Sequence, residues 1–149
     1  MLTPNMYATG AGPASAMCDF VPGLAMNATD AGTPASLLAV ADTHVTAIPL
    51  HASFLAIDAQ CDAATLSAAP VVEYYGVDDA SNITPLLNAA GDRQITFNGD
   101  IVLVSTGVYK IAEKATGQYL LDVRGARKVV TKRITAAAGG NVTLLHKTL

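Results

Sequence analysis

The sequence predicts an all-β protein: an antiparallel β-sandwich or a jelly-roll-like barrel that follows an extended N-terminal arm. Three observations lead to this prediction. In the second half of the chain, short β-prone runs alternate with turn residues at intervals of about eight to twelve residues. The first 35 residues contain four of the seven prolines, which interrupt helices and central strands. No repeat with a period of about 20 to 50 residues is present, so a solenoid is not expected.

The predicted arm spans residues 1–35, and the predicted sandwich domain spans residues 36–149. Disordered tails are usually charged and poor in apolar residues, whereas this segment carries several large aliphatic and aromatic side chains. We therefore expect the arm to lie along a surface of its own chain or of a neighbour, and we expect deletion of residues 1–30 to leave a folded domain. The candidate contact residues in the arm are Leu2, Met6, Tyr7, Met17, Phe20 and Leu24.

The segment after the arm is ambiguous at first and then β-prone. Residues 33–42 fit a short helix, with Thr33 as N-cap and Pro34 at the first helical position, or equally a strand. A long strand interrupted near Pro49 is expected over residues 45–57.

The remaining strands are expected at regular spacing. They cover residues 71–77, 95–97, 100–104, 108–112, 119–123, 128–135 and 142–146, and residues 83–87 are expected to pair back on the first of them. Asn98-Gly99 stands between two of these runs. Because Asn-Gly strongly favours two-residue hairpin turns, we interpret it as a bend between two short strands. A ten-residue strand with a glycine bulge is the alternative.

Charge is sparse and unevenly placed. Charged residues make up 14% of the chain, against about 25% in an average soluble domain. Residues 1–92 hold nine Asp or Glu and no Lys or Arg, whereas residues 93–149 hold nine Lys or Arg and three Asp or Glu. The two halves could pair internally across neighbouring strands, or the acidic half of one copy could meet the basic half of the next.

A basic segment is the second candidate for contact with other proteins. Its five cationic residues are Arg124, Arg127, Lys128, Lys132 and Arg133. On a strand, Lys128 and Lys132 face one side and Arg133 faces the other. A nucleic-acid groove places basic residues on one surface with aromatic side chains for stacking, and no aromatic residue lies between positions 120 and 149. We therefore expect no nucleic-acid partner and a solvated or subunit-contacting edge strand instead.

No motif indicates catalysis, a metal or a cofactor. The chain lacks a Gly-x-Ser-x-Gly elbow and a phosphate-binding loop, so we expect no enzymatic activity. His44, His51 and His146 lack zinc-ligand spacing and are interpreted as surface or turn histidines. Cys18 and Cys61 are expected to be free thiols, with a disulfide formed after release from a cell as the alternative. No secretory signal or membrane span is recognised, which favours a cytoplasmic origin.

The proline-punctuated arm, the Ala- and Thr-rich surface of low charge and the β-series ITFNGDIVLVSTGVYKIAEKATGQYLLDVRG resemble small structural proteins of tailed-phage virions, nearest to capsid decoration or cement proteins. The resemblance implies a non-enzymatic β-rich domain, often trimeric, whose arm and edge strands contact the major capsid protein and brace the shell. It also implies assembly in the host cytoplasm and residence in the virion. A tail or baseplate component is one alternative. A ligand- or carbohydrate-binding module that uses Tyr74, Tyr75 and Asp78-Asp79 is another.

Overall fold

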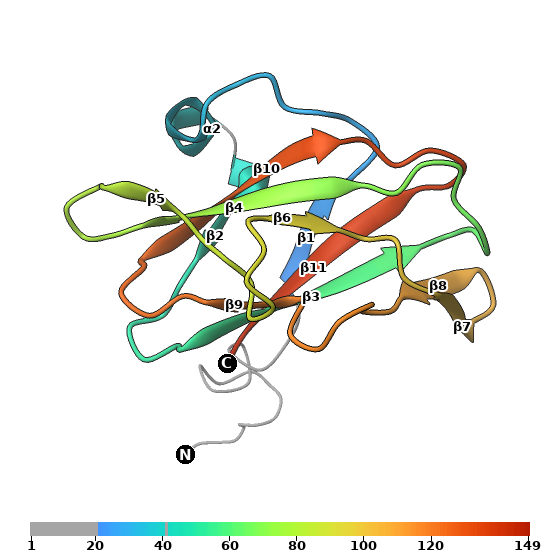
Figure 1. The fold of residues 1–149 in the computed structure, drawn as a ribbon. Coiled ribbons are helices and arrows are strands. Elements are labelled where there is room, and N and C mark those ends of the chain that lie inside the picture. Colours follow the sequence, from blue (N-terminus) through green and yellow to red (C-terminus); the bar gives the residue numbers. More distant parts are fainter. Residues whose placement is uncertain (1–20, 41) are drawn as a thin grey trace, which may run out of the picture.

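Two antiparallel sheets face each other in the protein, and the predicted β-sandwich is confirmed (Figure 1). The computed structural model describes residues 21–40 and 42–149. The first sheet runs in the order β1 (Val21–Ala25), β11 (Val142–Thr148), β3 (Phe54–Cys61), β8 (Val108–Ile111) and β7 (Ile101–Ser105), with β9 (Leu120–Asp122) also paired to β3. The second runs in the order β2 (Val45–Ala47), β10 (Lys128–Thr135), β4 (Val71–Val77) and β5 (Ile83–Pro85), with β6 (Gln94–Thr96) also paired to β4.

The core lies between the two sheets and is built by alternation along the strands. In β3, Leu55, Ile57 and Ala59 point inward and are buried, as expected for a strand with one face on the core. They meet Val72 and Tyr74 of β4, which are both completely buried. Most of the core side chains are aliphatic, so many modest contacts hold the two layers together.

One of the two cysteines can be placed. Cys61 is buried in the core as a free thiol, in agreement with the sequence-based expectation. Cys18 lies outside the described residues.

The Asn98-Gly99 segment connects the two sheets and does not form the hairpin turn that Asn-Gly favours. β6 before it pairs with β4, whereas β7 after it pairs with β8 in the other sheet. Gly99 does not have a positive φ, which a type I′ turn would require. A Cβ atom at this position would lie only 2.0 Å from the carbonyl oxygen of Ala112. Gly99 is therefore needed for the close approach of two backbones.

The folded domain begins earlier in the chain than the sequence suggested. β1 pairs with β11 although it lies within the expected arm. Leu24, expected to contact a neighbour, is 4% exposed, and Met26 beyond it is completely buried. Pro22 is tolerated because β1 is an edge strand whose register shifts between Pro22 and Leu24. The other five candidate contact residues of the arm lie outside the described residues.

Residues 33–42 adopt the helical alternative. The helix α2 (Pro34–Val40) begins directly after Thr33, whose side-chain Oγ1 accepts a hydrogen bond of 3.2 Å from the backbone N–H of Ser36. This is the N-cap geometry expected for Thr33. Leu37 packs with Tyr75 and Val130 against the outer face of the second sheet. A short 3₁₀ helix, η1 (Asp42–His44), connects α2 to β2.

The long strand expected over residues 45–57 is two strands in different sheets. β2 pairs with β10 in the second sheet, and β3 pairs with β11 in the first. Pro49 lies between them and accepts a turn hydrogen bond from the N–H of Ala52. Because proline cannot donate to a ladder, the chain turns here and crosses to the other layer.

Candidate protein-contact surface

The opposite charges of the two halves pair within the chain. Four ion pairs join an acidic residue of the first half to a basic residue of the second: Asp30 with Arg133, Asp58 with Lys110, Glu73 with Arg93, and Asp79 with Arg127. This observation supports internal pairing across neighbouring strands. It leaves less of the basic segment available to a neighbouring copy.

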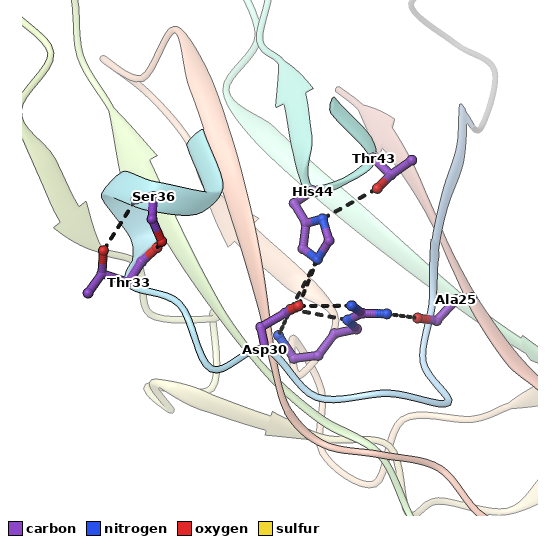
Figure 2. Close-up of polar contacts among 7 residues, drawn as sticks. Ala25, Asp30, Thr33, Ser36, Thr43 and His44 are labelled. Atoms are coloured by element: carbon purple, nitrogen blue, oxygen red, sulfur yellow. Dashed lines mark hydrogen bonds and ion pairs between the residues drawn. The ribbon is translucent and has the colours of Figure 1, made fainter. Parts of the chain in front are cut away.

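The Asp30–Arg133 pair is the most buried of the four ion pairs. Together with His44 these two residues form the Asp30 cluster (Figure 2). The Asp30 side chain is 7% exposed and accepts hydrogen bonds from the backbone N–H, Nε and guanidinium nitrogen of Arg133. The Nε2 atom of His44 lies 3.0 Å from Asp30 Oδ1. Burial alone would raise the pKa of Asp30, but the hydrogen bonds from Arg133 and His44 lower it to about 2. The cluster fastens residues 25–30 to β10, because Arg133 also donates to the carbonyl of Ala25.

The basic segment does not lie on an edge strand. β10 pairs with β4 along its length and with β2 over Lys128–Val130. Beyond β2, the N–H of Asp30 donates to the carbonyl of Arg133, so the cations of β10 do not border a free edge. Arg133 is 15% exposed and engaged with Asp30, and Lys132 stands opposite Glu73 in the ladder. Arg124 pairs with its own neighbour Asp122. Lys128 is exposed at the start of β10.

The residues suggested for a carbohydrate site do not form an open surface. Tyr74 is completely buried, and its hydroxyl oxygen is hydrogen-bonded to His146 Nε2 at 2.7 Å. Tyr75 is 7% exposed and donates to Glu73. Asp78 accepts hydrogen bonds within its own turn, and Asp79 pairs with Arg127. Neither tyrosine offers a ring face on which a sugar could stack.

Two histidines expected at the surface are buried. His44 is 8% exposed and His146 is 3% exposed. His44 is held by Asp30, and His146 packs edge-on against the Tyr74 ring at a centroid distance of 5.5 Å. The sequence around His146 does not show whether this residue faces inward, since that depends on the register of β11. His44 lies in η1, and its partner Asp30 comes 14 residues earlier in the chain.

We expect His146 to make the fold sensitive to mild acid. Burial lowers the pKa of this imidazole from 6.5 to about 4. Below pH 6.5 the unfolded chain takes up a proton at this position and the folded chain does not. The free energy of unfolding should therefore be unaffected by His146 well above pH 6.5 and should fall by about 3 kcal/mol as the pH drops to 4. Urea unfolding at pH values between 4 and 7 measures this free energy. Its dependence on pH should be weaker in His146→Gln than in the wild type. Equal slopes in the two proteins would show that His146 is not its source.

The most unusual surface feature is the strand β7. Val102, Leu103 and Val104 are consecutive in the chain and are 54%, 60% and 62% exposed. Leu50, Leu87 and Leu149 are also exposed, but each lies alone in the sequence, which is normal for a soluble domain. β7 is the outermost strand of the first sheet and forms a hairpin with β8 at one end of the sandwich (Figure 1). Within the described residues, β8 is its only paired neighbour.

An apolar groove adjoins β7. It has a volume of about 650 Å³ and is lined by residues of β3, β7, β8 and β9 and of the segment between the last two. Two ionic side chains take part in the lining, and both are engaged by the chain itself. Lys110 Nζ lies 3.3 Å from Asp58 Oδ1, and Glu113 accepts a hydrogen bond of 2.8 Å from the backbone N–H of Tyr119. What the groove offers to a partner is mainly apolar.

The exposure of β7 was missed at the level of sequence, although a signal was present. A strand with one solvated face alternates apolar and polar residues. Ile101-Val-Leu-Val104 does not alternate, because all four residues are apolar. Such a run is also typical of a strand buried on both faces, and only its position at the sheet edge distinguishes the two cases.

Comparisons with known proteins do not assign a family: no family model, curated protein or solved structure matches the chain. Among the described residues, no three His, Cys, Asp or Glu side chains gather as a metal site would require. No helix in this part of the chain is long and apolar enough to cross a membrane.

Proposed function

We propose that this chain is a non-enzymatic structural protein of a tailed-phage virion, which decorates the capsid and stabilises it through repeated contacts with shell subunits. The observation that carries this proposal is the exposed aliphatic run of β7 beside an apolar groove. An exposed apolar surface of this kind is typical of sites where proteins contact other proteins. The resemblance of the chain to decoration proteins adds the virion as the setting.

The proposed contacts are apolar rather than ionic. The ion pairs between the acidic and basic halves form within one chain, and Arg133 is too buried to reach a neighbour. Each apolar contact can be weak, since repetition over a lattice of identical subunits multiplies the effective affinity. Hydrophobic association does not weaken with added salt in the way that ionic contacts do.

Co-sedimentation with virions tests this proposal. Purified chain is added to tailed-phage particles from cultures that produce it, after the bound copies have been stripped, and the pelleted fraction is measured at 0.1 M and 1 M NaCl. We expect saturable binding that persists at 1 M NaCl. Binding that is lost at 1 M NaCl would contradict the apolar mode, and no saturable binding at either salt concentration would contradict the proposed function.

A further inference from the structure

We propose that β7 pairs with β7 of a second copy of this chain, antiparallel and centred on Val102, so that the first sheets of two copies join into one continuous sheet. This inference deepens the proposed function and rests on it only in treating β7 as a protein-contact surface. The pairing uses the backbone edge of β7 and leaves its side-chain faces and the groove to shell subunits. The partner is named by the chemistry of the strand: a backbone edge to which no strand of the described residues is paired, apolar side chains, and no charge between Ile101 and Ser105.

The backbone of β7 is prepared for such pairing. The N–H of Ala112 donates to the carbonyl of Asp100 at 2.8 Å, so the polar groups of Asp100 point toward β8. Backbone groups of successive strand residues point to opposite sides, so those of Ile101 and Leu103 point to the free edge. In a pairing centred on Val102, Ile101 of each copy stands opposite Leu103 of the other. The outward N–H and C=O groups of Ile101 and Leu103, four in each copy, are then all hydrogen-bonded to the other copy.

The side chains are also self-complementary in this register. Val102 of one copy lies against Val102 of the other in a closely spaced pair. Val102 and Val104 both line the groove, so the pairing places two apolar grooves side by side across the twofold axis. The two Asp100 carboxylates stand at opposite ends of the paired strands, about 13 Å apart, and are largely screened from each other.

The side chains that usually protect an edge strand, charged residues and proline, are missing from β7. Natural proteins protect edges with lysine, proline or an inward charge, and the strand IVLVS contains none of these. The bulge between Leu103 and Ser105 lies past the centre of the proposed pairing. A twofold contact is isologous and closed, so it removes both β7 edges without continuing into a fibre.

Cysteine cross-linking of the full chain tests the register. Val102→Cys is made in a Cys18→Ser background, with Leu103→Cys in the same background as the matched control. In the proposed register, residues 102 face each other within disulfide range, whereas residues 103 are diagonal and too distant. Mild oxidation should give a reducible dimer of Val102→Cys and leave Leu103→Cys monomeric. Cross-linking of Leu103→Cys but not of Val102→Cys would overturn the register.

Sedimentation equilibrium tests the pairing itself. Val102→Lys places two like charges opposite each other and should weaken the dimer by about tenfold or more without lowering the melting temperature. A wild-type chain that is monomeric, or a Val102→Lys chain that dimerises equally well, would overturn the inference. So would loss of the dimer on deletion of residues 1–20 but not in Val102→Lys. A chain that dimerises through β7 but binds no virions would contradict only the proposed function, and a monomer that binds virions would contradict only this inference.

Discussion

Deletion of residues 1–30 is expected to abolish folding, because it removes β1 and the side chains with which it enters the core. Leu24 is 4% exposed and Met26 is completely buried, and truncation of a buried aliphatic side chain costs about 2–5 kcal/mol. The deletion also leaves the largely buried Arg133 guanidinium without Asp30. Together these losses are comparable with the whole stability of an ordinary domain, about 5–15 kcal/mol. Far-UV circular dichroism and thermal unfolding would measure the outcome.

The matched control is deletion of residues 1–20, which retains β1 and Asp30. This shorter deletion should preserve the cooperative unfolding transition. A cooperative transition in the chain that lacks residues 1–30 would show that β1 is dispensable and would restore the arm boundary expected from the sequence.

Asp30→Ala is expected to lower the free energy of unfolding by about 3–5 kcal/mol, because it leaves a buried cation without its partner. The Arg133 side chain is 15% exposed. Arg133 donates three hydrogen bonds to Asp30, one of them from its backbone N–H, and one from its guanidinium to the carbonyl of Ala25. The melting temperature should fall by roughly 10 °C. Chemical denaturation at pH 7, where the carboxylate of the wild-type protein is ionised, measures the loss directly.

Asp79→Ala provides a control with the same chemistry at the surface. Asp79 also pairs with an arginine, Arg127, but its side chain is 76% exposed. Exposed ion pairs contribute about 0–1 kcal/mol, so this variant should unfold almost as the wild type does. If Asp30→Ala and Asp79→Ala lowered the free energy of unfolding equally, burial would not explain how much the Asp30 cluster contributes to stability.

Most strands could be predicted from the sequence because turn residues delimit them. The expected bounds of β4 and β10 agree with the structure, and residues 83–85 pair back on β4 as expected. Asn98-Gly99 was misread because the same dipeptide that favours a hairpin turn also permits close contact with another backbone. Nothing near it in the sequence reveals Ala112, which lies on the far side of the β7–β8 hairpin.

The candidate site could be predicted only in part. Proline in the first 35 residues suggested an arm, but Pro22 is compatible with an edge strand, so the boundary was placed too late. The basic segment drew attention by its charge, yet Arg127 and Arg133 find acidic partners that lie far away in the sequence. The apolar run at Ile101–Ser105 was recognised as a strand, but its exposure depends on which strands lie beside it.

The copy number of the chain in purified virions tests the central claim most directly. Quantitative mass spectrometry of tailed-phage particles from cultures that produce the chain would give its ratio to the major capsid protein. A protein that decorates a capsid through repeated contacts should be present in many copies and at a fixed ratio to the shell subunit from one preparation to the next. Absence of the chain from intact particles, or a ratio that varies between preparations, would contradict the proposed role.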